Sequence, residues 1–518
     1  MNPATIDHLL KSVEKPSRYT GDELNSIHKE HNGKIKMALC YPDLYEIGMS
    51  NIGLQILYHI VNKLDYAVAE RIYSPAVDME KVLADNKLAL FSLESKTSVK
   101  DFDILGFSLQ NELTYSNILN VLKLSNIDIH RKNRTENDPL IIAGGACTTN
   151  PLPLSDFIDA FVIGDGEEVI VEIVNAYRTV ARSSLLQHLS AIPGIYVPGY
   201  NKLENVQRRI VKDINTIDYP TKPIVPYIQI IHDRAAIEIM RGCPRRCNFC
   251  QAGNINKPVR ILTKERVVQL ALETIKNTGY EDLSLVSLSS SDYPGILELA
   301  QELSLTFKKK KVSISLPSLR ADTFKGEISK EIQSIRKSNV TIAPEAGTQR
   351  LRDYIQKDLT EEKIIEAVLS SFAAGVNKVK LYFMMGLPTE TDEDIKGIVD
   401  LAYKLIVESK KISNRAKITV NVSTFIPKKN TPFENEKVIS IEEIDKKQTY
   451  LKENLRHKSI DLKWHDAKMS TVEGVFSMGD ENTGRILEEA FNKGAKFDNW
   501  QEHFNYQIWE NAIAKNKI

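Results

Sequence analysis

The stretch that decides the fold is RGCPRRCNFC, Arg241–Cys250, which directly follows the apolar segment AAIEIM at 235–240. Its three cysteines, Cys243, Cys247 and Cys250, have the spacing C-x-x-x-C-x-x-C. Three thiolates on one short loop can bind three irons of a 4Fe–4S cluster and leave the fourth iron without a protein ligand. A metal ion with an open position can bind a further molecule directly. The loop therefore predicts a 4Fe–4S cluster with one open iron.

Two other interpretations of the three cysteines are a zinc site and a set of unrelated buried thiols. Structural zinc sites use four ligands, usually arranged in two paired hooks. No cysteine follows Cys250, and the 10 histidines show no spacing that supplies a second hook. The ligand count therefore favours the iron–sulfur cluster.

Composition limits the class of protein. The chain has 518 residues, of which 42% are hydrophobic and 26% charged, which is typical of a globular protein of several domains. Lys plus Arg and Asp plus Glu both number 68, so charge does not support a nucleic-acid partner, although a local basic groove is not excluded. Five cysteines argue against a disulfide-stapled secreted fold. No apolar run reaches the length of about 18 residues that spans a bilayer, and the N-terminus lacks a signal-peptide core. We expect a cytoplasmic protein without a membrane partner.

Residues 34–184 alternate apolar strands with helical stretches. Strands are expected at 34–42, 88–93, 103–109, 139–145 and 159–168, and a helix at 50–64 with Ser50 or Asn51 as its cap. This alternation predicts an α/β domain with a doubly wound parallel sheet. Such sheets bind ligands beyond the carboxyl ends of their strands, where the sequence places Asp43, Ser108, Gly144, Gly145 and Gly164.

The rest of the chain divides into four further parts. Residues 1–33 are predicted to be a helical lead-in that is followed by a polar loop ending near Gly33, and the proline-studded residues 185–234 are predicted to be a linker. Residues 235–438 are predicted to form a full or partial β/α barrel, with strands at 235–240, 282–289, 311–317, 339–345, 378–386 and 418–427. Residues 439–518 are predicted to be mostly helical, with Trp464, Trp500 and Trp509 as packing anchors.

A three-cysteine loop of this spacing at the end of the first strand of a β/α barrel resembles the signature of the radical S-adenosylmethionine (radical SAM) superfamily. The resemblance implies that the open iron chelates the amino and carboxylate groups of SAM. An electron from the cluster would then cleave the sulfonium bond and give methionine and a 5′-deoxyadenosyl radical. It also implies a reducing partner such as flavodoxin or ferredoxin.

The resemblance continues near the cluster loop and the second barrel strand. Phe249, the aromatic residue before the last cysteine, matches the position that usually packs near the adenine of SAM. SLSSSDY, 287–293, ends the second strand, where the superfamily holds the SAM amino group. The usual Gly-Gly-Glu is absent, so the resemblance implies Ser289, Ser290 and Asp292 as the candidates.

Two later stretches extend the resemblance. TIAPEAGTQRLRDYIQK looks like the strand whose acidic residue contacts the SAM ribose. Glu345 fits that role, with Arg352 and Lys357 as candidate partners of the SAM carboxylate. KLYFMMGLPTET is similar to the Gly-x-Pro-x-Glu-Thr turn of the subgroup that includes methylthiotransferases. There, Gly386 and Pro388 would shape the wall beside the adenine.

The N-terminal stretch CYPDLYEIGMSNIG resembles the cobalamin-binding fold. The usual Asp-x-His-x-x-Gly pattern is here Asp43-x-Tyr45-x-x-Gly48, and the usual Ser-x-Leu is Ser108-x-Gln110. The resemblance implies a cobalamin site formed by Asp43, Tyr45, Gly48, Ser108, Gly144 and Gly145. Tyrosine is a much poorer lower ligand for cobalt than imidazole. Two interpretations follow: cobalamin bound without a histidine ligand, or a domain that kept the fold and lost the cofactor.

Nearly end to end, the chain resembles uncharacterised radical SAM proteins with an N-terminal cobalamin-type domain. Two segments depart from that pattern: PFEN at 432–435 replaces Pro-Phe-Gln-Trp, and SMGD at 477–480 replaces Arg-Gly-Asp. The resemblance implies a radical SAM enzyme that cleaves SAM and acts on an unidentified substrate, with cobalamin-assisted methyl transfer as an extension.

Two alternative functions remain at this stage. A methylthiotransferase acting on tRNA or a ribosomal protein generally needs a second cluster held by three N-terminal cysteines, and only Cys40 and Cys147 occur there. An RNA- or ribosome-binding scaffold with a structural cluster would use Arg241, Arg245 and Arg246 of the cysteine loop. We favour the interpretation that these arginines balance the negative charge of the cluster and of the SAM carboxylate.

Overall fold

The computed structural model describes residues 6, 8–317 and 340–516. The chain divides into two compact units. The first contains residues 1–212, 216–233 and 475–518, and the second contains 213–215 and 234–474. The C-terminal residues therefore belong to the first unit, although they follow the second in the chain. Most of the predicted linker, 185–234, is also part of the first unit.

The first unit is built on a six-stranded sheet with the order β2-β1-β3-β4-β5-β6. The first five strands are parallel, and β6 runs antiparallel to β5. The strands are Ile35–Tyr41, Ala67–Tyr73, Ile104–Ser108, Leu140–Gly144, Ala160–Val162 and Ile195–Tyr196. The chain leaves β1 for β2 on one side and returns to β3 on the other. This places the topological switch point, the usual ligand position of such sheets, between β1 and β3.

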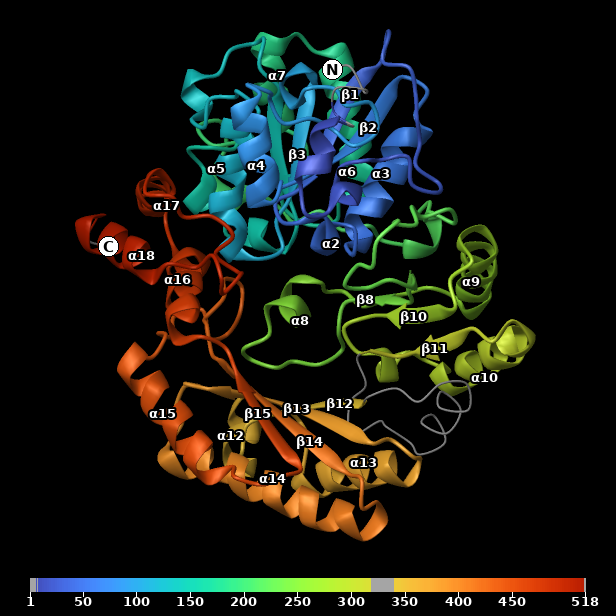
Figure 1. Cartoon of the computed structure of the whole chain (residues 1–518), viewed down its shortest axis with the longest axis vertical. Helices are drawn as coiled ribbons and strands as arrows, with labels where there is room; N and C mark the ends of the chain where they lie inside the picture. Colours follow the sequence, from blue (N-terminus) through green and yellow to red (C-terminus); the bar gives the residue numbers. More distant parts are fainter. Residues whose placement is uncertain (1–5, 7, 318–339, 517–518) are drawn as a thin grey trace. The chain divides into compact units, whose positions relative to one another are not determined.

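Helices cover this sheet and confirm the predicted doubly wound architecture. They are α2 (Tyr45–Gly48), α3 (Ile52–Lys63), α4 (Val77–Asp85), α5 (Tyr115–Leu124), α6 (Glu167–Thr179) and α7 (Arg182–Ser190). Helix α3 begins after Asn51, whose side chain accepts a hydrogen bond from the Leu54 N–H, as the capping prediction requires. α3 packs beside α6, and α5 packs beside the C-terminal helix α17, Thr483–Asn492 (Figure 1).

One sequence prediction about the first unit is wrong, namely the strand expected at 88–93. Residues 88–93 are mostly irregular with one isolated bridge at Phe91, and the second strand is instead β2, 67–73. The sequence AVAERIY hides this strand because Glu70 and Arg71 interrupt its apolar pattern, yet all seven of its residues are buried. In the N-terminal lead-in, residues 6, 8 and 9 are helical and two 3-10 turns follow at Leu10–Ser12 and Pro16–Arg18, before mostly irregular chain up to Gly33.

A buried ionic network explains how β2 tolerates these charges. The Arg71 guanidinium donates to Glu23 and to Glu94, each at 2.6 Å, and all three side chains are almost fully buried. Although burial opposes ionisation, Arg71 lowers the pKa of Glu23, whereas burial raises the pKa of Glu94. Removal of one partner from such a network leaves an uncompensated buried charge.

The C-terminal segment of the first unit is held by another buried carboxyl group, that of Asp498. Asp498 lies just before helix α18, Tyr506–Asn516, and accepts hydrogen bonds from Ser116 Oγ at 2.5 Å and from Trp509 Nε1 at 2.8 Å. Both donors are neutral, so no positive charge offsets burial. Burial raises the pKa of Asp498 from 3.8 to about 6.

We expect Asp498→Asn to stabilise the protein at neutral pH. Because the folded state binds this proton more tightly than the unfolded chain, the carboxyl group favours folding below about pH 4, and this contribution is lost as the pH rises through about 6. A pKa difference of this size corresponds to about 3 kcal/mol at pH 7.5. Thermal unfolding of the variant and the wild type at several pH values measures the effect. A difference that does not change between pH 4.5 and pH 7.5 would contradict this assignment.

The second unit contains two parallel sheets with the orders β11-β10-β7 and β12-β13-β14-β15. The strands are β7 (Ala235–Glu238), β10 (Asp282–Val286), β11 (Ser313–Ser315), β12 (Val340–Glu345), β13 (Lys378–Met385), β14 (Lys417–Thr424) and β15 (Ile460–Trp464). All six predicted barrel strands are present, apart from residue 339, which lies outside the described residues. Strand β15 lies in the predicted helical region, 439–518.

Helices follow the strands of the second unit, as in β/α folds. They are α9 (Lys264–Thr278), α10 (Ile296–Phe307), α12 (Gln349–Tyr354), α13 (Glu361–Ala373), α14 (Asp392–Ile412), α15 (Ile441–Asn454) and α16 (Ala467–Met478), whose last residues belong to the first unit. The main core of this unit joins β12, β13 and β14 to α13, α14 and α15. A small antiparallel pair, β8 (Met240–Arg241) and β9 (Arg260–Ile261), lies beside the cysteine loop.

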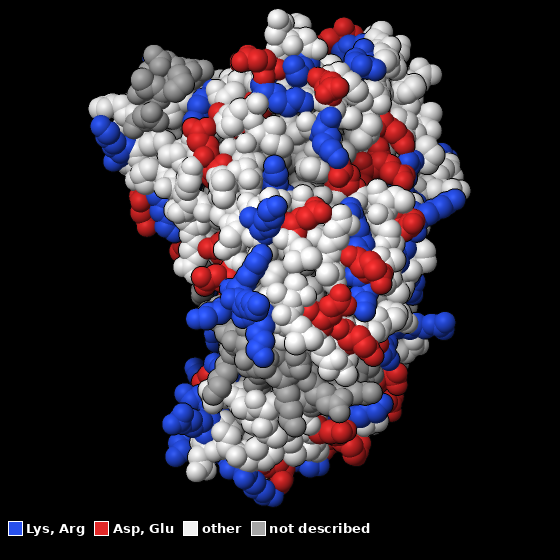
Figure 2. Space-filling model, turned by 90° about the vertical axis from the view of Figure 1, so that its right-hand side faces the viewer, with Lys and Arg blue, Asp and Glu red and all other residues white. Residues whose placement is uncertain are grey.

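The surface charge and the apolar character of the helices bear on whether the protein binds nucleic acid or a membrane. Figure 2 shows acidic and basic side chains interspersed over one face, with one dense group of basic residues. The exposed Lys308–Lys311 directly follow α10. Among the described residues, no helix combines the length and apolar character needed to cross a membrane.

Candidate functional site

The cysteine loop connects β8 to the short helix α8, Gln251–Ile255. Gly242 begins the loop with φ +91°, and a Cβ atom there would lie 2.5 Å from the carbonyl oxygen of Asn256. Only glycine fits this close approach without strain. At the other end, the Gly253 N–H donates to Cys250 Sγ at 3.3 Å, so the last cysteine caps α8.

The three cysteines are free thiols of intermediate exposure. Gly253 packs against two of them: a Cβ there would lie 3.4 Å from Cys250 Sγ and 3.9 Å from Cys243 Cβ. Burial raises the pKa of the Cys250 thiol, and Cys247, Cys243 and Glu345 raise it further. The described part of the chain contains no group of three His, Cys, Asp or Glu side chains placed to hold one metal ion. In a 4Fe–4S cluster each thiolate binds a different iron, and three free thiols on one loop fit that group.

The loop is anchored to the segment that follows β12. The Asn248 N–H donates to the Ile355 carbonyl and Asn248 Nδ2 donates to the Tyr354 carbonyl, both at 3.0 Å. Phe249 packs against an apolar cluster that includes Ala346 and Leu387. These two residues belong to the PEAG and GLPTET turns. Phe249, the predicted adenine neighbour, therefore lies where two of the predicted SAM-binding turns meet.

A charged pair joins the cysteine loop to the end of β10. Arg245 donates to the two carboxylate oxygens of Asp292 at 2.6 and 3.1 Å, and Ser289 Oγ donates to Asp292 at 2.7 Å. Arg245 also lies 3.4 Å from Asp358. Ser290 is fully buried and bonds to Ser287 Oγ and the Leu285 carbonyl, so it stabilises the turn itself. The structure thus joins Ser289 and Asp292 to the cysteine loop.

Glu345 occupies an unusual position at the end of β12. The register of the β12–β13 pair shifts between Ile342 and Glu345, and Glu345 adopts φ +68°. A non-glycine residue in this left-handed region is strained, and such residues cluster at functional sites. Its carboxylate accepts a hydrogen bond from Lys357 Nζ at 3.0 Å. The two residues predicted to contact SAM are therefore paired with each other.

The other predicted residues of the second unit have clear structural contacts. Arg352 is fully buried and donates to the carbonyls of Ala346 at 2.9 Å and Leu359 at 3.1 Å, so its guanidinium fixes the PEAG turn. Gly386 has φ +79°, and its N–H donates to Glu390 at 2.9 Å. Burial raises the pKa of Glu390, which pairs with Lys447. Pro388, in the same turn, is partly exposed.

In the first unit, Asp43 lies at the carboxyl end of β1 beside the switch point. Its carboxylate accepts hydrogen bonds from Asn499 Nδ2 at 2.6 Å, from Trp500 Nε1 at 2.9 Å and from the Leu44 N–H at 2.7 Å. Burial raises its pKa. Asn117 Oδ1, on α5, accepts the N–H of Phe497 at 2.7 Å. The C-terminal segment FDNW, 497–500, therefore lies at the β1 end of the crevice, which sequence reasoning did not find.

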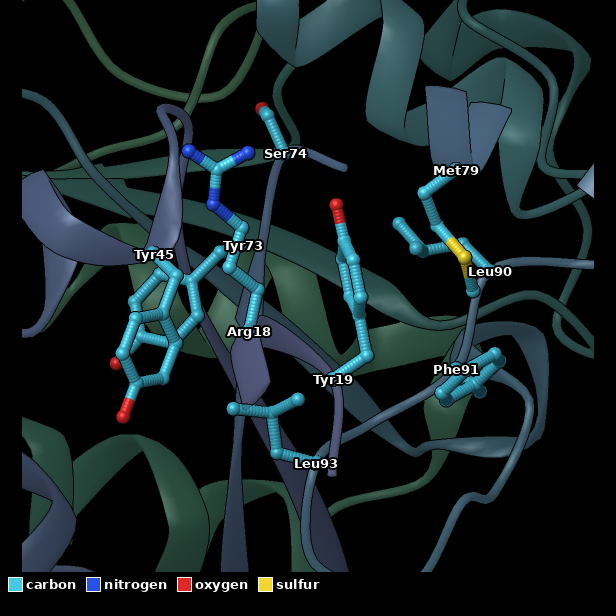
Figure 3. Close-up of a pocket in the computed structure, with 9 residues that line it drawn as sticks. All are labelled: Arg18, Tyr19, Tyr45, Tyr73, Ser74, Met79, Leu90, Phe91 and Leu93. Atoms are coloured by element: carbon cyan, nitrogen blue, oxygen red, sulfur yellow. The ribbon is translucent and has the colours of Figure 1, made fainter. Parts of the chain in front are cut away.

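Tyr45 is closed off from any ligand. Only 2% of the residue is exposed, and its hydroxyl donates to Glu23 at 2.8 Å. Burial, with the charge of Glu23, raises the pKa of Tyr45 far above its usual value, so it remains a neutral phenol. The adjacent cavity, lined also by Arg18 and Tyr73, has a volume of about 20 Å³ (Figure 3). A corrin ligand through Tyr45 does not fit this arrangement.

Two of the remaining residues predicted for cobalamin, Gly48 and Gly145, are close-packed. A Cβ at Gly48 would lie 2.3 Å from the ring of Tyr73, and one at Gly145, which has φ +112°, would lie 2.4 Å from the Leu109 carbonyl. Gly144 has more space, with its nearest neighbour at 3.8 Å in Val162. Ser108 Oγ accepts a hydrogen bond from Gln110 at 3.3 Å. The close packing of the domain itself thus explains why glycine occupies positions 48 and 145, without a bound cofactor.

Comparison with known families decides the class of protein. The model described as "Radical SAM proteins, N-terminal" matches residues 53–198, and the model "Radical SAM superfamily" matches residues 237–402. The second match includes the whole cysteine loop. The chain belongs to the radical SAM superfamily. Radical SAM proteins use a 4Fe–4S cluster and SAM, and the three free cysteines of this radical SAM protein fit the cluster.

Two relatives are similar to this chain over more than half of its length. The uncharacterised protein MJ0966 of Methanocaldococcus jannaschii is 29% identical over 92% of this chain and 98% of its own. The uncharacterised methyltransferase PH0819 of Pyrococcus horikoshii is 26% identical over 60% of this chain and 65% of its own. Among solved structures, the radical SAM methyltransferase TsrM from Kitasatospora setae, with cobalamin and a [4Fe–4S] cluster bound, has a TM-score of 0.57 at 14% identity and covers 77% of each chain. This last similarity shows a shared fold.

Proposed function

We propose that this radical SAM protein reductively cleaves SAM and uses the resulting radical on a substrate that is not yet identified. The observation that carries the proposal is the set of contacts around the cysteine loop. Arg245 binds Asp292 from the end of β10, Asn248 binds the segment after β12, and Phe249 packs against the turn after β13. Chemistry-bearing residues from the ends of three strands thus meet at the loop that holds Cys243, Cys247 and Cys250.

The chain's own residues would hold SAM at this position. Glu345, whose carboxylate pairs with Lys357, would accept hydrogen bonds from the ribose hydroxyls. Lys357 or Arg245 would then be available to the SAM carboxylate, while Ser289 and Asp292 would accept its amino group. Phe249 would pack against the adenine, with Gly386 and Pro388 beside it.

A 4Fe–4S cluster in the loop would supply one electron to the SAM sulfonium, so that the S–C5′ bond breaks into methionine and a 5′-deoxyadenosyl radical. That radical would take a hydrogen atom from the substrate and become 5′-deoxyadenosine. An acidic electron carrier such as flavodoxin or ferredoxin would provide the electron. We place the reaction in the cytoplasm, where thiols stay reduced.

Cobalamin-assisted methyl transfer is the second candidate. The fold shared with TsrM over 77% of the chain supports it, together with a relative named as a methyltransferase. The closed environment of Tyr45 restricts this candidate to a corrinoid that takes no ligand from that residue. Extraction of the cofactors from protein purified without oxygen from cobalamin-fed cells tests it. Corrinoid in an amount far below the protein would rule it out.

We predict that the anaerobically reconstituted protein binds about four irons per chain. A methylthiotransferase would need a second cluster and about eight irons, but the first unit offers only Cys40 and Cys147. Both are buried, and burial raises the pKa of Cys40 well above its usual value. Iron titration with the absorbance spectrum is the measurement. A value near eight would revive the methylthiotransferase and contradict the proposal.

A further inference from the structure

The first unit contains a large pocket that none of the cluster or SAM residues lines. Its volume is about 840 Å³, within the usual range of small-ligand sites. Five segments far apart in the sequence form its walls: 14–18, 44–46, 76–78, 229–231 and 497–503. The segment that binds Asp43 at the switch point, FDNW, therefore also forms one wall of this pocket.

The acidic groups of the pocket outnumber the basic ones. The two basic side chains, Lys15 and Arg18, both bind the single carboxylate of Glu46, at 3.0 and 2.9 Å. Despite burial, these two partners lower the pKa of Glu46, which stays ionised. Both of its oxygens accept hydrogen bonds from these two side chains. The lining cations are thus already engaged by a residue of the pocket itself.

Three further carboxylates line the pocket. Asp78 accepts the N–H of Glu14 at 2.7 Å and the N–H of Met79 at 2.7 Å. The carboxylates of Glu14 and Glu502 form no ion pair within the described ranges 6, 8–317 and 340–516. Four carboxylates against two cations leave the lining with an excess of negative charge. Such a cavity attracts cations and excludes anions.

Apolar and aromatic surface completes the lining. Trp500 is oriented by the hydrogen bond from its Nε1 to Asp43, and the His503 ring lies 5.6 Å from the Phe497 ring. Val77 and Ile231 line the pocket and are 42% and 59% exposed. Aromatic rings beside carboxylates favour organic cations, because the ring face attracts positive charge.

We propose that this pocket is a second ligand site and that it binds an organic ammonium ion carried on an apolar body. The carboxylates of Glu14 and Glu502 receive the ammonium group, and Trp500, Val77 and Ile231 contact the apolar part. An anionic ligand of the same shape would be repelled by these two carboxylates. Lys15 and Arg18 would not attract it, because both are bound to Glu46. None of its residues belongs to the cysteine loop, so binding to this pocket is measured separately from SAM cleavage.

Hexylammonium and hexanoate are matched probes, because they share an alkyl chain and differ in the sign of charge. We expect hexylammonium to bind the full-length protein saturably, measured by calorimetry and by the change in Trp500 fluorescence. The double variant Glu14→Gln, Glu502→Gln should weaken this binding at least about tenfold, a loss of about 1.4 kcal/mol. Trp500→Phe should remove the fluorescence response.

The control variant is Glu204→Gln, which changes an exposed carboxylate of the same unit outside the pocket. It should leave the affinity for hexylammonium unchanged. The proposal is overturned by hexanoate binding as tightly as hexylammonium, by unchanged affinity in the double variant, or by no saturable binding of hexylammonium. Since binding is measured without reductant or SAM, none of these results bears on the proposed SAM cleavage.

Discussion

Cys247→Ala will remove the iron–sulfur cluster and with it the formation of 5′-deoxyadenosine. Cys247 is the middle thiol of a loop that has no spare cysteine, since Cys40 and Cys147 lie buried in the other unit. With two thiolates left, iron should fall from about four per chain to below about one after reconstitution. Without the cluster no electron reaches the sulfonium, so 5′-deoxyadenosine should fall to the background of a reaction without protein.

Two variants separate this result from a general loss of folding. Cys147→Ala removes a thiol far from the loop in sequence and should keep both the iron and the product. Glu345→Gln should keep the iron but raise the SAM concentration needed for half-maximal rate, because it weakens the proposed ribose contact. A Cys247→Ala protein that still forms 5′-deoxyadenosine would show that the loop does not carry the reaction.

Arg71→Met will strongly destabilise the first unit. It leaves Glu23 and Glu94 without their counter-ion in a region where all three side chains are at most 2% exposed. Removing one partner from a buried ionic network costs about 3–5 kcal/mol. For a unit of this size that corresponds to a fall of about 10 °C in the thermal unfolding midpoint. Differential scanning calorimetry of the apo protein measures it.

The matched control is Lys81→Met, which breaks an exposed pair with Asp85 and should change stability by less than about 0.5 kcal/mol. The triple variant Glu23→Gln, Arg71→Met, Glu94→Gln also removes the two carboxylates that Arg71→Met leaves without a counter-ion. It should recover much of the stability lost in Arg71→Met, because the neutral amides need no counter-ion. Arg71→Met with an unchanged midpoint would mean that the network does not stabilise β2.

The sequence predicted which turns lie near the cysteine loop, because there the signals are local. The cysteine loop follows β7 and β8, and the SLSSSDY turn follows β10, which pairs in parallel with β7, so their carboxyl ends lie at one edge of a sheet. The PEAG turn follows β12, which belongs to the other parallel sheet of the unit. Strand β2 was missed for a physical reason. Its two charged residues look like surface positions in the sequence, and only the folded network with Glu23 and Glu94 makes them suitable for a buried strand.

Local sequence patterns could not predict that the C-terminal segment FDNW lies at the carboxyl end of β1, beside the switch point of the first sheet. Asp43 and Trp500 are separated by 457 positions, and nothing near either residue indicates the other. Likewise, Asp43-x-Tyr45-x-x-Gly48 predicts a cofactor by resemblance, whereas the fate of the Tyr45 hydroxyl depends on Glu23, in the segment before the first strand. Contacts of this range depend on the tertiary fold.

The most direct measurement of the central claim is the yield of SAM cleavage. The anaerobically reconstituted wild-type protein is reduced, incubated with SAM, and assayed for 5′-deoxyadenosine and methionine. We predict that both products form in equal amounts and only in the presence of reductant. A protein that holds four irons and reduces normally, yet forms neither product, would contradict the assignment of the cysteine loop as a SAM-cleaving centre.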